Sequence, residues 1–172
     1  MSEKNLTKVR LRAMEPEDLD FLYNIENDRE LWNVGNTNVP YSRYVLHDYI
    51  ANATNDIYND GQVRMIVENA DGRTVGMADL FDFNASHRRA ELSIVVMRGF
   101  RRCGYAEASV RYMLHYAQRI LHLNQVYAVI SVDNRPSIAL FDKCGFTTSA
   151  NLPKWLFDGE KYTDAVVMSK FF

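Results

Sequence analysis

The feature that most constrains this fold is a strand-like segment that leads through a short basic turn into a long amphipathic helix. Residues 92–96 are mostly apolar, residues 101–106 form the turn, and residues 104–122 have helical spacing. A second strand pattern follows at 125–131. A helix that connects two strands in this way is typical of parallel neighbours in one sheet. We therefore expect a β-α-β unit with the turn at the carboxyl end of its first strand.

The turn itself, Arg101-Arg102-Cys103-Gly104-Tyr105-Ala106, has the properties of an anion site. The first turn of a helix leaves backbone N–H groups without partners, and the helix dipole adds partial positive charge there. Because Gly104 and Ala106 are small, a pyrophosphate can approach these amides. The sequence thus predicts a phosphate-bearing ligand at this position.

Two common nucleotide signatures do not fit this turn. Gly99 and Gly104 have the spacing of a P-loop, but Tyr105-Ala106 follow where Lys and Ser or Thr are needed. The dinucleotide pattern G-x-G-x-x-G is absent. Taken alone, the turn also fits an ordinary glycine corner whose arginines are solvated.

The rest of the chain predicts a mixed α/β fold with a mostly antiparallel sheet and helices on both faces. Glu15-Pro16 begins one helix and Ser42 caps another, because Pro suits the first helical position and Ser suits the cap. We expect one domain over residues 1–172, with a loop at 33–40. The predicted strands are 8–12, 63–68, 74–83, 89–96, 125–131, 146–149 and 165–169, and a short helix covers 136–143 and ends at Gly145.

Composition excludes several classes of protein. The net charge of −2 argues against a nucleic-acid binder that depends on bulk positive charge. Two cysteines, Cys103 and Cys144, provide neither a disulfide framework nor a metal cluster. The polar start and the absence of a long apolar run predict a cytoplasmic protein without a membrane span.

A second motif gives the turn its context. The segment Asn134 to Phe146 reads N-R-P-S-I-A-L-F-D-K-C-G-F, and with the turn it resembles the GCN5-related N-acetyltransferase (GNAT) superfamily. Leu11-Arg12 with Glu17-Asp18-Leu19, the segment 87–91 and the segment 157–164 extend the resemblance over most of the chain. The polyamine and RimJ/RimL-like branches are the most similar.

This resemblance implies a GNAT-like acyl-CoA N-acyltransferase fold with a splayed strand pair and acetyl-CoA as co-substrate. The pantetheine arm is expected to bind along residues 94–96 like an added strand. Asn134 can also simply cap its helix, a role compatible with cofactor binding. The cofactor-binding residues that the resemblance implies are Ile94, Val95, Val96, Arg101, Arg102, Cys103, Gly104, Tyr105, Ala106, Glu107, Asn134, Ser137, Phe141 and Lys143.

Acetyl transfer to an amine needs a base, an oxyanion donor and a proton for the leaving thiolate. Glu91 is the candidate base, with a surface ion pair to Arg88 or Arg89 as the alternative. A strand N–H of Ile94 or Val95 is the candidate oxyanion donor. Many family members carry Tyr at the position of Phe141, and a phenyl ring cannot give up a proton, so the acid stays unassigned.

The acceptor is expected to be a primary amine, either a polyamine-like small molecule or a peptide N-terminus. Asp79 and Asp82 are candidate substrate-binding acids beside Glu91, and Asp48, Asp56 and Asp60 could widen an acidic groove. Segment 37–43 carries no acid, which puts an allosteric polyamine site in doubt. Aromatic residues that could line the groove are Trp32, Tyr41, Tyr44 and Trp155.

Two other functions stay open at this point. Without a tyrosine at position 141, the chain could bind acyl-CoA as a sensor or partner module with little transfer. A plain nucleotide-binding domain is the third possibility, and binding of ATP in preference to acetyl-CoA would indicate it. The resemblance further implies a homo-oligomer.

Overall fold

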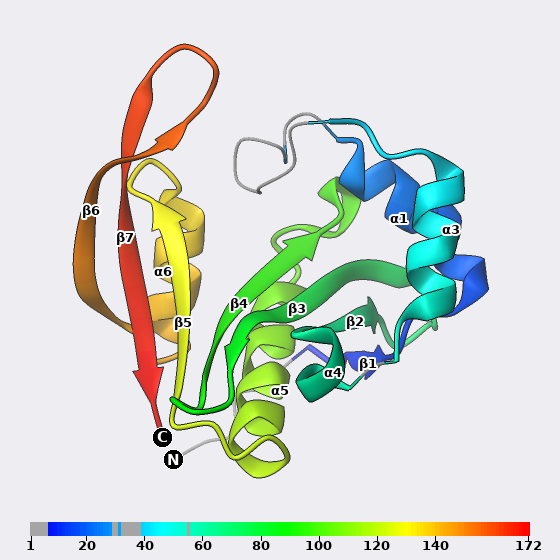
Figure 1. The fold of residues 1–172 in the computed structure, drawn as a ribbon, viewed down its shortest axis with the longest axis horizontal. Helices are drawn as coiled ribbons and strands as arrows, with labels where there is room; N and C mark the ends of the chain where they lie inside the picture. Colours follow the sequence, from blue (N-terminus) through cyan, green and yellow to red (C-terminus); the bar gives the residue numbers. More distant parts are fainter. Residues whose placement is uncertain (1–6, 29–30, 32–38, 55) are drawn as a thin grey trace.

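A computed structural model describes residues 7–28, 31, 39–54 and 56–172. Its strands form one seven-stranded sheet in the order β1-β2-β3-β4-β5-β7-β6 (Figure 1). The prediction of a single domain stays a prediction, and this continuous sheet supports it. The strands are β1 (Arg10–Arg12), β2 (Val63–Glu68), β3 (Thr74–Asn84), β4 (Arg89–Val96), β5 (Gln125–Ser131), β6 (Thr147–Phe157) and β7 (Tyr162–Phe171).

The sheet is antiparallel except at its centre. β1 to β4 pair in sequence as antiparallel neighbours, and β5, β7 and β6 do the same. β4 and β5 are parallel and are joined through the long helix α5 (Tyr105–Arg119). The predicted β-α-β unit and the mostly antiparallel mixed sheet are therefore confirmed.

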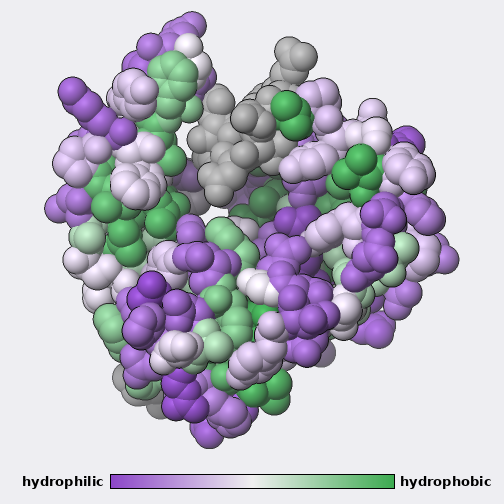
Figure 2. All heavy atoms as spheres, viewed as in Figure 1, coloured by the Kyte–Doolittle hydropathy of each residue, from purple (hydrophilic) through white to green (hydrophobic). Residues whose placement is uncertain are grey.

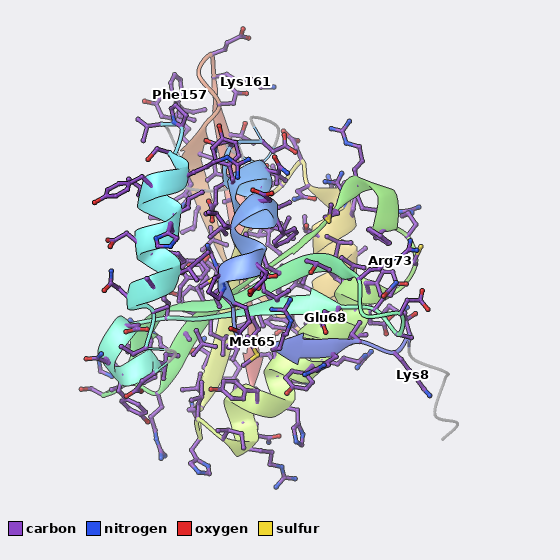
Figure 3. All side chains as sticks on the ribbon, turned by 90° about the vertical axis from the view of Figure 1, so that its right-hand side faces the viewer. Lys8, Met65, Glu68, Arg73, Phe157 and Lys161 are labelled. Atoms are coloured by element: carbon purple, nitrogen blue, oxygen red, sulfur yellow. The ribbon has the colours of Figure 1, made fainter. Side chains whose placement is uncertain are left out.

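Helices lie on both faces of this sheet. The 3-10 helix η1 (Pro16–Asp18), α1 (Leu19–Glu26) and α3 (Arg43–Asn52) cover one face. Figure 3 shows α1 and α3 side by side there, with Met65 and Glu68 on the neighbouring strand β2. The helix α5 packs on the other face, against β3 and β4. The remaining helices among the described residues are α4 (Ile57–Asp60), η2 (Arg98–Phe100) and α6 (Arg135–Lys143).

The N-terminal motif is explained by one arginine. The Arg12 guanidinium donates to both Asp18 carboxylate oxygens, at 2.6 and 2.9 Å, and to Glu68 on β2. Asp18 also accepts from the backbone N–H of Glu15, which closes the cap of η1. Burial opposes ionisation of Asp18, but these donors outweigh it and lower its pKa. The motif thus fastens the first helix to the edge of the sheet.

Each face of the sheet has its own hydrophobic core. The main core lies on the α5 face, where Val110 and Met113 meet strand residues such as Leu92 and Val126. The second core lies on the α1–α3 face and includes Leu22, Leu46 and Met77. Val95 packs against the second core and Ile94 against the main core, as strand alternation requires. Side chains of β4 therefore alternate between the two faces, and Glu91 shares the α1–α3 face with Val95.

The two final strands are much longer than predicted. Instead of residues 146–149 and 165–169, β6 and β7 form a hairpin of 11 and 10 residues. Figure 3 shows its tip, with Phe157 and Lys161, projecting beyond the rest of the ribbon. The prediction was wrong because β6 is an exposed edge strand whose pairing with β7 shifts register twice. Such a strand lacks the alternation of polar and apolar residues that marks a half-buried one.

Other local differences are small. The short helices α4 and η2 were not predicted, and the predicted loop at 33–40 lies mostly outside the described residues. The cap of α3 is as expected, since Ser42 Oγ accepts from Val45 N. No helix in the described part of the chain is both long and apolar enough to cross a membrane.

Candidate active site between the diverging strands

The central parallel pair opens after three positions. Arg89, Ala90 and Glu91 pair with residues 125–127, and no pair between β4 and β5 follows in the described structure. β4 stays paired with β3 up to Val96, and β5 stays paired with β7 up to Ser131. The strands consequently diverge as a wedge, visible in Figure 1, which confirms the predicted splayed pair. Beyond Glu91, the backbone groups of β4 on the side away from β3 have no partner strand among the described residues, and of these Val96 O accepts from Arg101 Nε.

The surface is open at this wedge. Figure 2 shows a hollow between the β6–β7 side of the molecule and the side formed by α1 and α3. A linear ligand can lie along β4 there and make strand-like hydrogen bonds, as an added strand does. Residues Ile94, Val95 and Val96, which were predicted to bind the cofactor, form the upper part of this β4 edge.

The predicted phosphate turn lies directly after β4. Gly104 is the N-cap of α5 with φ +84°, a left-handed conformation that favours glycine. The first intrahelical bond runs from Ala108 N to Gly104 O, so the amides of Tyr105, Ala106 and Glu107 have no intrahelical acceptor. A glycine cap supplies no side-chain oxygen to these donors. The turn therefore presents backbone N–H groups and the positive end of a helix dipole to an anion.

Contacts around the turn hold it in shape. Thr7 Oγ1 donates to the backbone oxygen of Cys103 at 2.8 Å, and a Cβ on Gly104 would lie 2.5 Å from that hydroxyl. Arg101 Nε donates to Val96 O at 3.1 Å, which ties the turn to the end of β4. Arg102 is exposed and has φ +66°. Thr7 was missed from the sequence because its contact spans 96 positions.

The second motif covers the whole of α6 and both of its ends. Asn134 Oδ1 accepts from Ser137 N at 3.2 Å, so the capping role is confirmed. This bond uses only the amide oxygen of Asn134. Gly145 follows α6 with φ +86°, as expected for a residue just past a helix end. The motif is therefore a capped helix next to the wedge, and its contact with the cofactor stays a prediction.

Two predicted cofactor-binding residues are bound to each other. Lys143 Nζ lies 2.5 Å from a Glu107 carboxylate oxygen, and Arg111 donates to the same carboxylate at 3.0 Å. The hydrogen bond from Lys143, with that from Arg111, lowers the pKa of Glu107. This pairing links α5 to α6, and the contact of these residues with a cofactor stays a prediction.

Phe141 has a packing role in this structure. The residue is 3% exposed, and its ring meets that of Phe146 edge to face, with ring centroids 4.8 Å apart. Cys144 is also buried, and burial raises the pKa of its thiol. Neither side chain is a ready proton donor, so the thiolate acid stays unassigned.

Glu91 lies at the point where the strands part. Its Oε1 accepts from the backbone N–H of Val129 on β5 at 3.3 Å, rather than from Arg88 or Arg89. Burial raises the pKa of Glu91, the Val129 amide opposes this, and the negative charge of Asp82 adds to it. A carboxylate with a raised pKa at the closed end of this wedge is suited to take up a proton.

The two predicted substrate acids have different surroundings. Asp79 is 7% exposed, and Arg64 donates to both of its oxygens, at 2.8 and 3.0 Å. Arg64 also contacts Glu26 of α1 at 2.7 Å. With both oxygens held in this way, Asp79 is not an exposed ligand, and its role toward an acceptor stays a prediction. Asp82 is exposed and accepts from the Tyr127 hydroxyl.

The wider acidic groove is not assembled around Glu91. Asp56 caps α4, and Asp60 accepts from the backbone and hydroxyl of Thr54. Asp48 and Asp60 line a separate hollow with Tyr49 and Asn52, between α3 and α4. These acids are therefore occupied with the local structure of α3 and α4.

The four aromatic residues predicted for the groove are dispersed. Tyr41 packs against the second core, and Tyr44 is 82% exposed on α3. Trp155 is exposed on the hairpin, and Trp32 lies outside the described residues. Arg64 and Tyr127 were missed from the sequence because their partners come from other strands and, for Arg64, from α1.

Comparisons with known proteins agree with this geometry. The profile of the acetyltransferase (GNAT) domain family matches residues 8–147. Spermidine N(1)-acetyltransferase of Vibrio cholerae is 27% identical over 169 residues, which cover 96% of each chain. The enzyme of the same name from Escherichia coli K12 is 27% identical, over 95% of this chain and 86% of its own.

Solved structures give the same result. A crystal structure of the Vibrio cholerae enzyme in complex with CoA and spermine has a TM-score of 0.82, with 28% identity over 95% of both chains. A dodecameric structure of that enzyme has a TM-score of 0.79, with 28% identity over 95% of this chain and 93% of the other. The wedge, the glycine-capped helix and the matching profile together place this chain in the GNAT acetyltransferase family, whose members use acetyl-CoA to acetylate amines.

Proposed function

We propose that this chain transfers the acetyl group of acetyl-CoA to a primary amine of a polyamine-like cation, with Glu91 as the general base. The observation that carries the choice of acceptor is the charge of the α1–α3 face. Four carboxylates, those of Glu26, Asp79, Asp82 and Glu91, gather there with Arg64. An excess of negative charge beside the base attracts a cation and disfavours anionic acceptors.

The residues for the co-substrate are suited to its chemistry. The amides at the start of α5 would hold the pyrophosphate, and the open edge of β4 would pair with the pantetheine arm. The helix α6 would add further contacts to acetyl-CoA through Asn134, Ser137 and Lys143. Acetyl-CoA supplies the thioester that makes the acetyl group transferable. Binding along β4 brings this group toward Glu91, where the wedge closes.

Glu91 and β4 would then carry out the proton and charge steps. Glu91 accepts a proton from the acceptor ammonium, directly or through a water, so that the neutral amine can attack the thioester carbonyl. Of the two candidate β4 donors, the Ile94 N–H points toward β5, because Met97 N donates to β3 and successive N–H groups of a strand alternate in direction. The Ile94 N–H would stabilise the negative charge that develops on the carbonyl oxygen. Because Phe141 has no ionisable group, we assign protonation of the thiolate to water.

Relatives support the acceptor class and the assembly. The two relatives described above are named spermidine N(1)-acetyltransferases, and a similar structure contains spermine. We extend this to a polyamine acceptor for this chain and to a homo-oligomer, in line with the dodecameric neighbour. Because acetyl-CoA is an intracellular metabolite, we place the activity in the cytoplasm.

An acceptor panel tests this proposal. CoA release is measured with acetyl-CoA and spermidine, spermine, a peptide with a free N-terminus, an amino acid and an aminoglycoside. We expect the polyamines to give a kcat/KM at least about tenfold above the peptide and the amino acid, since the field of these carboxylates favours the acceptor with more positive charges. The aminoglycoside is also a polycation, so its rate relative to the polyamines tests acceptor shape. Preference for the peptide or the amino acid would overturn the acceptor assignment. Tight acetyl-CoA binding without turnover on any amine would indicate a sensor instead.

A further inference from the structure

Three ionisable side chains lie in a row across the centre of the sheet. Phe81 of β3 pairs with Glu91 of β4, and Glu91 pairs with Tyr127 of β5. Parallel partners direct their side chains to the same face, so Tyr127 shares the α1–α3 face with Glu91. The Tyr127 hydroxyl donates to Asp82, the residue after Phe81. The bond therefore bridges β5 to β3 across the strand that carries Glu91.

Asp82 reaches this position through an unusual backbone. In a regular strand, Asp82 would point to the opposite face from Phe81. Its φ of +47° and the register shift between Phe81 and Asn84 form a bulge that redirects it. A left-handed conformation is costly for a residue with a side chain, although Asp tolerates it better than most. The bulge places a carboxylate beside Glu91 at a cost in backbone energy.

The other charges near Glu91 differ from Asp82. Asp79, on the same strand, has both oxygens bound to the cationic Arg64, which also meets Glu26. Asp82 is instead bound to a phenol, and a neutral donor holds a carboxylate in place without cancelling its charge. Arg89, two residues before Glu91 on β4, lowers the pKa of Tyr127 because its positive charge favours the ionised phenol. Among these acids, Asp82 is therefore the one whose negative charge raises the pKa of Glu91.

We propose that Tyr127 and Asp82 are positioning residues for Glu91: the phenol holds Asp82 in place, and the fixed negative charge makes Glu91 a stronger base. This inference rests on the proposed role of Glu91. Burial, the bond to Asp82 and the charge of Glu91 raise the pKa of Tyr127, so the phenol keeps its proton throughout the working range. Burial and Asp82 also raise the pKa of Glu91. A base with a raised pKa takes a proton from an ammonium group more readily.

The test compares Tyr127→Phe and Asp82→Asn with the wild type over about pH 4 to 9, a range that begins near the ordinary glutamate pKa and covers raised values. Asn removes the charge, and Phe frees the exposed Asp82 carboxylate to turn into solvent. Both variants should move the acid limb of kcat/KM to lower pH and reduce kcat/KM by roughly tenfold at neutral pH. This loss is smaller than the 100-fold or greater loss expected on removal of the base. Affinity for acetyl-CoA should not change.

Matched controls make the same chemical changes elsewhere. Tyr58→Phe alters a tyrosine that is 66% exposed on α4, and Asp71→Asn alters an acid in the turn between β2 and β3. Both should behave as wild type. The double variant of Tyr127 and Asp82 should lose no more activity than either single variant, because both act through one charge. Asp82→Glu, which keeps that charge, should restore part of the activity and of the pH profile.

A second measurement does not depend on turnover. A carboxyl NMR titration of Glu91 in the ligand-free protein should have its midpoint at lower pH in Asp82→Asn than in wild type. An unchanged midpoint, or pH profiles that coincide with wild type, would overturn the inference. If Glu91→Gln retains full turnover, the proposed function of Glu91 fails. If Glu91→Gln is inactive while the Tyr127 and Asp82 variants keep the wild-type profile, only the positioning inference fails.

Discussion

The carboxylate of Glu91 accepts a hydrogen bond from the backbone N–H of Val129, at 3.3 Å, where the two central strands begin to diverge. Up to Glu91, β4 pairs with β5 as a parallel strand. After Glu91 the two strands no longer pair. The Glu91 side chain thus satisfies an amide that the divergence would leave unpaired. It also places a half-buried carboxylate at the closed end of the ligand wedge.

The pH dependence of the reaction should reflect this burial. Glu91 must be deprotonated to act, and its raised pKa means that it is protonated as the pH falls through a range above that of an ordinary glutamate, about pH 4.3. We expect the acid limb of kcat/KM to lie above that value. The acceptor amine must also lose a proton, so its own titration appears in the same profile. Repeating the profile with an acceptor whose amine has a lower pKa identifies the Glu91 limb, because only the amine limb moves. An acid limb at the ordinary glutamate value would contradict the burial argument.

Substitution of Phe141 by Tyr should keep or raise turnover. A phenol at this position, with a pKa of about 10, can protonate a departing thiolate, which a phenyl ring cannot. Phe146→Tyr is the matched control, because Phe146 is 1% exposed in the same ring pair. The control should lose roughly 1–3 kcal/mol of stability from a buried, unpaired hydroxyl. If Phe141→Tyr loses most of its turnover, the reading of position 141 as a missing acid is wrong.

Acetyl-CoA should protect Cys103 from a thiol reagent. Cys103 is exposed and belongs to the turn that is expected to hold the pyrophosphate, whereas Cys144 is buried. Mass spectrometry of the labelled protein should show rapid modification of Cys103 that acetyl-CoA slows. Cys144 provides the internal control, since it should react only when the protein unfolds. Equal labelling of Cys103 with and without acetyl-CoA would count against this position of the ligand.

Gly76→Ala should destabilise the sheet beside the wedge. A Cβ on Gly76 would lie 2.2 Å from the backbone oxygen of Val95 on β4, so one of the strands must shift. We expect a loss of about 1–3 kcal/mol in thermal or denaturant unfolding, as for other overpacked sites, together with weaker acetyl-CoA binding. Gly99→Ala is the control, because nothing lies within 4 Å of a Cβ there. Equal stability of the two variants would show that the strands tolerate the contact.

The sequence predicted the centre of the fold better than its edge. The bounds of β2, β4 and β5 agree with the predicted strands because apolar and β-branched runs end there at turn residues. The hairpin of β6 and β7 was underestimated since its outer strand is exposed and contains Pro153. Its strand conformation depends on pairing with β7, which a local pattern does not reveal.

The site was predictable where its residues are close in the sequence. The glycine cap of α5 and the Asn134 cap of α6 each follow from a short motif. The bridge from Tyr127 to Asp82 joins residues 45 positions apart and depends on a bulge that has no signal in the sequence. The same holds for Arg64, which brings Glu26 of α1 and Asp79 of β3 together.

The most direct test of the account is the steady-state acetylation of spermidine by Glu91→Gln, measured beside its affinity for acetyl-CoA. Gln preserves the size of the side chain but cannot accept the proton of an ammonium group. We predict a fall in kcat/KM of about 100-fold or more, with acetyl-CoA bound as in the wild type. Turnover of spermidine close to that of the wild type would contradict the central claim that Glu91 is the base.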